Sequence, residues 1–140
     1  MTIALSVFAW LWLLIAAHEA GHFCVAYILD RPISRLVIGS GPRLREWYWR
    51  GIRCDCRLLP FSGEVGMVAL SRRRWVNVAI FAAGPAVNVV LWGLLDALGL
   101  RDAANCSLIL AAGNLVPVGN LDGAQIWREL RRPRARMEEI

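Results

Sequence analysis

The chain has 140 residues, a length that predicts a single domain. Its hydrophobic content of 57% and mean hydropathy of +0.46 exceed those of ordinary soluble domains, which favours a membrane protein over a soluble one. The formal net charge of +5 comes from arginine without any lysine, and the arginines flank apolar stretches instead of alternating with base-stacking aromatic residues. We therefore expect no nucleic-acid partner.

The first apolar stretch covers about residues 3–29 and contains the only two histidines of the chain, His18 and His22. A helix places residues four apart on one face, so both imidazoles can bind one metal ion, and Glu19 beside them is a candidate general base. Three ionisable groups in a membrane-length apolar segment usually mark a functional site. The stretch is too long for a signal peptide and lacks the basic residues that precede one, so it predicts a retained membrane span. A chance match to the HExxH pattern, with core histidines, is the alternative.

The next region is polar, and it combines many arginines with two strand-like stretches. These stretches lie at 34–38 and 53–61 and are separated by glycines, which predicts a small membrane-associated β segment in the first loop. Trp47-Tyr48-Trp49 suits the aromatic belt of a membrane interface. An exposed strand edge here would pair with an extended substrate, whereas a hairpin that only seals the bundle is the alternative. Cys54 and Cys56 are interpreted as ordinary loop residues, because two thiols without further ligands indicate a metal site only weakly.

Two further apolar stretches follow, at about 75–100 and 103–118, with a short helix expected at 123–131. The third stretch is interrupted by Asn114, Pro117 and Gly119. Irregular backbone at membrane depth is tolerated only where it lines an enclosed or wet cavity. The sequence therefore predicts an all-α membrane fold of three transmembrane helices, with the β segment in the first cytoplasmic loop.

The distribution of arginine predicts the orientation of these spans. Arginines crowd the region between the first two spans and the region after the third, whereas only Arg101 lies between the second and the third. The positive-inside rule then places the N-terminus outside and the first loop and C-terminus in the cytoplasm. We expect an integral, multi-pass protein of the plasma membrane.

Asp122 is the predicted third metal ligand. In this orientation the first and third spans run in the same direction, and His18 and Asp122 fall at similar depth toward the cytoplasmic face. Two histidines, one carboxylate and an open position for water make a tetrahedral catalytic zinc site, with one Zn²⁺ per chain. The alternative is that Asp122 caps the N-terminus of the following helix.

Taken together, the motifs resemble those of the site-2 proteases, which are intramembrane zinc metalloproteases. The resemblance is carried by three elements in order, with weaker similarity at Ile38-Gly39-Ser40-Gly41-Pro42 and Pro60-Phe61-Ser62-Gly63. The three elements are His18-Glu19-Ala20-Gly21-His22, Gly84-Pro85-Ala86-Val87-Asn88 and Asn114-Leu115-Val116-Pro117-Val118-Gly119-Asn120-Leu121-Asp122-Gly123. The chain departs from the family at 118–120, where prolines are frequent, and at Ala124, where a second glycine is frequent.

The resemblance implies one protease core over residues 1–140, which hydrolyses peptide bonds within or near transmembrane segments of membrane proteins. His18, His22 and Asp122 would hold zinc, and Glu19 would act as the general base. Asn88 and Asn114 are candidates for binding the substrate backbone or the oxyanion, with helix–helix hydrogen bonding as the alternative.

The expected partners are a transmembrane protein substrate, the lipid bilayer and a separate regulatory membrane protein, while the oligomeric state stays open. The alternative function is a non-catalytic membrane protein that binds zinc or substrate on the same fold. Glu19 argues against this alternative, because a pure binding site needs no base beside its ligands.

Overall fold

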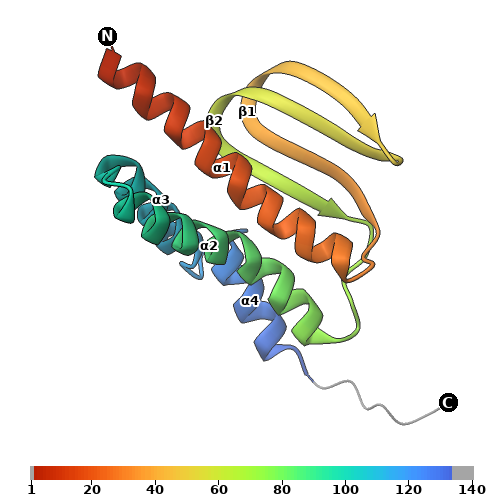
Figure 1. The fold of residues 1–140 in the computed structure, drawn as a ribbon. Helices are drawn as coiled ribbons and strands as arrows, with labels where there is room; N and C mark the ends of the chain where they lie inside the picture. Colours follow the sequence, from red (N-terminus) through yellow and green to blue (C-terminus); the bar gives the residue numbers. More distant parts are fainter. Residues whose placement is uncertain (1, 134–140) are drawn as a thin grey trace, which may run out of the picture.

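The computed structural model describes residues 2–133, and in this range four helices accompany a two-stranded antiparallel hairpin (Figure 1). In chain order the elements are α1 (Thr2–Ile28), β1 (Ile33–Trp49), β2 (Ile52–Met67), α2 (Arg74–Ala97), α3 (Arg101–Asn114) and α4 (Asp122–Arg131). α2 packs against α1, α3 and α4, and the hairpin packs along α1. The arginines at 134 and 136, which contribute to the predicted orientation, lie outside the described residues.

Two helices of the described chain are long and apolar enough to cross a membrane, Ala4–Ile28 and Arg74–Ala97. They correspond to the predicted spans 3–29 and 75–100. The predicted helix at 103–118 is wrong in its extent, because α3 has 14 residues and ends at Asn114. At 1.5 Å per residue α3 is about 21 Å long, which is short of the roughly 30 Å that a helix needs to cross the hydrocarbon core.

The helix ends at Asn114 for a local reason. Pro117 lacks an amide hydrogen and disfavours the helical conformation of the residue before it, and Gly119 adopts a φ of +60°. Residues 115–121 are therefore irregular, as the interrupted pattern predicts, and helical structure resumes only at Asp122. The expected short helix at 123–131 is present as α4.

The hairpin is longer and more continuous than the predicted β segment. β1 and β2 have 17 and 16 residues and pair from Ile33 opposite Met67 to Trp49 opposite Ile52. The prediction that glycines separate short strands is wrong at Gly39, which lies inside β1 with a φ of +86°. The register shifts around this glycine, so it bends the strand without ending it (Figure 1). Cys54 and Cys56 lie in β2, within the predicted strand-like stretch at 53–61.

Aromatic side chains join the hairpin to α1 at two levels. The Trp12 indole nitrogen donates a hydrogen bond of 3.0 Å to the backbone oxygen of Arg57. Near the hairpin tip, the ring of Trp49 packs against Phe23 and Tyr27, with centroid distances of 5.9 Å and 5.6 Å. The bent hairpin is therefore held against two separate levels of α1, on either side of the level of His18.

α1 and α2 approach closely at the level of the histidines. A Cβ atom added to Gly21 would lie 2.8 Å from the side chain of Val87 and 2.9 Å from the backbone oxygen of Ala83. Small residues permit this kind of close contact between helices in a membrane. The contact sets the histidine-bearing face of α1 directly against α2.

Candidate active site

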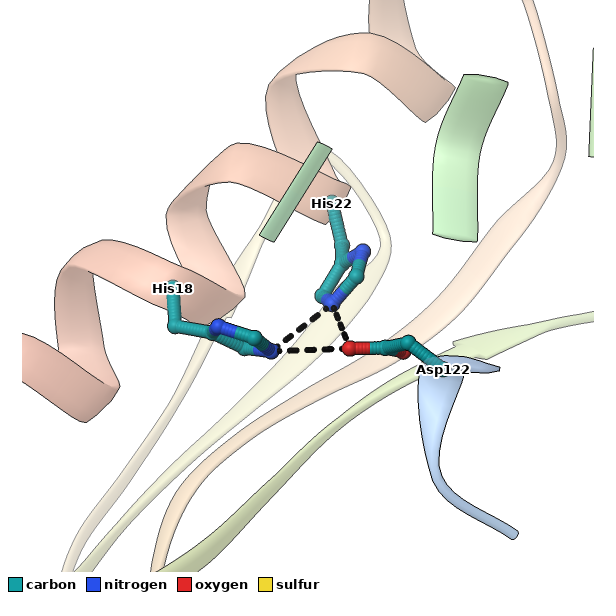
Figure 2. A group of neighbouring side chains, drawn as sticks. All are labelled: His18, His22 and Asp122. Carbon is teal, nitrogen blue, oxygen red and sulfur yellow. Dashed lines mark hydrogen bonds and ion pairs between the residues drawn. The ribbon is translucent and has the colours of Figure 1, made fainter. Parts of the chain in front are cut away.

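His18 and His22 of α1 meet Asp122, the first residue of α4, at one point (Figure 2). Asp122 Oδ2 lies 3.0 Å from His18 Nε2 and 3.2 Å from His22 Nε2, and the two Nε2 atoms are 3.1 Å apart. The edges of a tetrahedron around zinc, with bonds of about 2.0–2.1 Å, would measure about 3.3 Å. The three atoms therefore have nearly the spacing of three ligands of one zinc ion.

The orientation of His22 is fixed by the backbone of α2. His22 Nδ1 lies 2.7 Å from the backbone oxygen of Ile80, which can only accept a hydrogen bond, so Nδ1 carries the hydrogen. In neutral His22 the lone pair of Nε2 then points at Asp122 and His18. This is the arrangement that metal-binding histidines usually have, with the second ring nitrogen bonded to a carbonyl or carboxylate.

Space beside the two imidazoles is kept open by Gly84 of α2. A Cβ atom added to Gly84 would collide with His22 Nε2 and would lie 2.6 Å from His18 Nε2. The absence of a side chain at this position and the converging ligand atoms both fit a small metal ion.

Asp122 does not cap α4. The N-cap position of the helix is Leu121, which makes no side-chain capping hydrogen bond, and the Asp122 carboxylate faces the histidines instead. The adjacent Gly123 is tightly placed, because a Cβ atom there would collide with the backbone oxygen of Leu115. The irregular segment thus folds back onto the start of α4 and delivers Asp122 to the site.

Glu19 lies between the metal-ligand group and β2. Its side chain is buried, and a Cβ atom added to Gly63 would collide with the Glu19 carboxylate. A cavity of about 270 Å³ is lined by His18, His22 and Asp122, by Glu19 and by residues 61–65 of β2. The backbone of β2 therefore forms a wall of this cavity directly against the carboxylate.

The two asparagines singled out by the sequence occupy different positions. Asn88 is fully buried, and its Nδ2 lies 3.2 Å from His18 Nδ1, so it links α2 to α1 at a ligand. Asn114 ends α3, lines the cavity and donates a hydrogen bond of 2.9 Å from Nδ2 to the backbone oxygen of Leu110. The structure thus brings all six predicted site residues to one cavity, and they come from all four helices of the described chain.

Two contributors were missed by sequence reasoning. Ile80 acts through its backbone oxygen, which no sequence pattern reveals in an apolar span. Gly63 belongs to a stretch noted only for its weak family similarity, and its contact with Glu19 depends on how the hairpin bends.

Comparison with known proteins agrees with this geometry. The model of peptidase family M50 matches residues 6–101. A Clostridium acetobutylicum protein named as a candidate zinc metalloprotease is 31% identical over 96 residues, which is 59% of this chain and 27% of that protein. The chloroplastic membrane metalloprotease ARASP of Arabidopsis thaliana is 34% identical over 62 residues, which is 44% of this chain and 14% of that protein.

A solved structure has the same fold. The site-2 protease from Methanocaldococcus jannaschii matches with a TM-score of 0.60 and 22% identity, over 87% of this chain and 52% of that one. The chain thus spans less than a third of either curated relative and about half of the solved chain. Because the family model covers well over half of its length, the chain belongs to peptidase family M50, as its resemblance to the site-2 proteases predicts.

Proposed function

We propose that this chain is a zinc-dependent intramembrane endopeptidase, which hydrolyses peptide bonds within or near transmembrane segments of membrane proteins. The observation that carries the proposal is the group of His18, His22 and Asp122 with buried Glu19 beside it, on a helix long enough to cross a membrane. Residues 1–140 would act as one protease core.

His18, His22 and Asp122 would hold one Zn²⁺ per chain through the three atoms that converge. Bound zinc would supply a Lewis acid that activates water for attack on a peptide carbonyl. Glu19 accepts the proton of the attacking water and returns it to the leaving amine. The contact between β2 and the Glu19 carboxylate restricts where that carboxylate can lie.

The two asparagines take different roles in this proposal. Asn88 contacts His18 and is fully buried, so we assign it to holding the imidazole in place. Asn114 lines the cavity and uses one amide hydrogen for Leu110, which leaves a second for the substrate backbone or the developing oxyanion.

The hairpin offers a way to bind an extended substrate. In the described chain β2 pairs only with β1, so its other edge is available near the cavity wall at 61–65. A substrate span that has unwound locally can add to such an edge as a further strand. This favours substrate binding over the alternative that the hairpin only seals the bundle.

The arrangement of helix ends supports the predicted orientation. The end of α1, the start of α2 and the end of α4 lie at one end of the molecule (Figure 1). Arginines flank these ends at 31, 72–74, 128 and 131–132. We propose that this end is cytoplasmic, that the N-terminus lies outside, and that α3 with residues 115–121 completes a third crossing of the plasma membrane.

The first experiment separates a protease from a non-catalytic zinc-binding or substrate-binding protein. In purified chain we expect about one zinc per chain, retained by Glu19→Gln and lost by His18→Ala/His22→Ala. Because Glu19→Gln removes the base, cleavage of a model transmembrane substrate should fall by about 10² to 10⁴. The substrate should carry a glycine or proline near the depth of His22, with a stably helical version as the control.

Three results would contradict this proposal in different ways. Equal zinc in the wild type and the double histidine variant would refute the ligand assignment. Undiminished cleavage by Glu19→Gln would refute the general base. Failure of the wild type to cleave any helix-destabilised span would favour the non-catalytic alternative.

A further inference from the structure

A buried polar cluster joins α2 to α4 away from the zinc ligands. It consists of Ser71, Asn77, Glu129 and Arg132, here called the α2–α4 polar cluster. Asn77 is fully buried in the first turn of α2, and Glu129 of α4 is 6% exposed. Buried polar groups of this kind are costly unless their hydrogen bonds are satisfied, so their partners indicate what the cluster holds together.

The carboxamide of Asn77 is satisfied on both sides. Its oxygen accepts a hydrogen bond of 2.8 Å from the backbone nitrogen of Ser71, and its nitrogen donates one of 2.9 Å to the Ser71 backbone oxygen. The same nitrogen donates a hydrogen bond of 3.0 Å to Glu129 Oε2. The loop before α2 therefore fixes Asn77, and Asn77 in turn holds a side chain of α4.

Arg132 completes the cluster from the end of α4. Its Nη1 lies 3.6 Å from Glu129 Oε2 and donates a hydrogen bond of 3.4 Å to the Ser71 backbone oxygen. The buried carboxylate thus has a hydrogen-bond donor and a positive charge beside it. Bonds that involve an ionised acceptor are the stronger ones, so this contact fixes α4 better than a neutral pair would.

Glu129 is geometrically coupled to the third metal ligand. It lies seven residues, or nearly two full turns, after Asp122, so both side chains project from about the same face of α4. α4 packs on α2, and Glu129 meets Asn77 of that helix. Before Asp122 the chain is irregular and largely exposed over residues 115–121. Besides the contact of Leu115 with Gly123, the far end of α4 is therefore a second place where the position of the helix is fixed.

We infer that Asn77 and Glu129 are positioning residues, which hold α4 on α2 so that Asp122 stays at the spacing that His18 and His22 require. The expected effect on zinc binding rests on the proposed function, whereas the expected effect on the position of α4 does not. Groups that orient metal ligands typically contribute 10-fold to 100-fold to metal affinity, and we expect an effect of about that size.

The test uses the full chain in bilayer nanodiscs, with and without zinc. Glu129→Ala should weaken zinc binding by about 10-fold to 100-fold in competition with a chelator. In the zinc-free protein it should speed amide hydrogen exchange over residues 122–131 and leave exchange in α1 and α2 unchanged. Glu129→Gln should restore most of the loss, because its amide oxygen still accepts the hydrogen bond of Asn77, although the bond is weaker without the negative charge. Leu130→Ala, at an exposed neighbouring position of α4, is the matched control.

Asn77→Ala provides the second variant. It should speed amide hydrogen exchange over residues 122–131 as much as Glu129→Ala does. The double variant should exchange there little faster than either single variant, because both substitutions remove the contact between Asn77 and Glu129. The inference would be overturned if amide hydrogen exchange over residues 122–131 were no faster in Glu129→Ala than in Leu130→Ala. Failure of Glu129→Gln to rescue, or equally faster exchange in α1 and α2, would overturn it too. If the wild type binds no zinc the proposed function fails, while the exchange measurements still decide the position of α4.

Discussion

Gly84 controls how closely α2 approaches the two histidines. Its Cα faces both imidazoles, and a side chain as small as a methyl group would overlap His22 Nε2. Gly93 lies nine residues later in the same helix, and a Cβ atom added there would meet no atom within 4 Å. The two glycines therefore form a matched pair for testing the space that the metal ion needs.

We expect Gly84→Ala to lower zinc affinity sharply, because the new methyl group displaces one or both imidazoles. Gly93→Ala should leave zinc affinity unchanged, although each substitution also favours the helix by about 0.5–1 kcal/mol. Zinc affinity is measured by chelator competition, and thermal unfolding of the zinc-free protein reports the helix effect. Equal zinc affinity in the two variants would show that the space beside Gly84 is not needed for the metal.

Asn88 illustrates how a ligand imposes an orientation on its neighbour. With His18 Nε2 directed at the metal position, Nδ1 of the neutral ring carries the hydrogen and needs an acceptor. The Asn88 oxygen, which makes no hydrogen bond in the described chain, becomes that acceptor when the carboxamide turns by about 180°. The similar shape of the two ends of a carboxamide makes both orientations fit the same site.

Among the elements, the hairpin places a strand directly against Glu19, the proposed general base. Its bend brings β2 against Glu19, while Trp12 and the aromatic contacts of Trp49 hold it at two levels of α1. A strand supported in this way acts as a fixed wall. The position of Glu19 therefore depends on a segment more than forty residues away in the chain.

The substitution Gly63→Ala tests whether the contact of β2 with Glu19 fixes the position of the carboxylate. The added methyl group collides with the Glu19 carboxylate, so either Glu19 or the strand must move. Because a shift of about 1 Å in a catalytic group can cost about 10²-fold in rate, we expect cleavage to fall by that order. Zinc content should not change, since Glu19 is not a ligand in this assignment.

The control for this prediction is Gly93→Ala, which adds the same methyl group where it would meet no atom within 4 Å. Its cleavage rate should stay near that of the wild type. A Gly63→Ala variant that is as active as Gly93→Ala would mean that the contact with Glu19 has no bearing on catalysis.

For the whole molecule, the orientation decides which side of the membrane the site opens to. The hairpin tip near Arg50 contacts Tyr27 close to the end of α1, whereas Gly99 lies in the link between α2 and α3 at the opposite end (Figure 1). A reporter inserted at the hairpin tip should be cytoplasmic, and one inserted at Gly99 should be accessible from outside. The reverse labelling pattern would invert the proposed topology and move the cavity to the outer half of the bilayer.

Several features were predictable because they depend on local sequence. The four-residue spacing of the histidines, the two long apolar stretches and the helix after Asp122 all follow from helical periodicity and hydropathy. The prediction that Asp122 joins the histidines also follows, because two spans with the same direction place His18 and Asp122 at similar depth. The structure brings these residues together.

Other features were decided only by the tertiary structure, because they involve backbone atoms or contacts between distant segments. The Ile80 oxygen that orients His22 is a group that every residue carries, so no residue type reveals it. The contact between Gly63 and Glu19 joins β2 to α1, and Gly63 pairs with Ile38 directly beside Gly39. Gly39 bends β1 there, whereas the sequence indicates a glycine that ends a strand. Likewise, the contact between Asn77 and Glu129 joins residues 52 positions apart, which pair only once α4 has packed on α2.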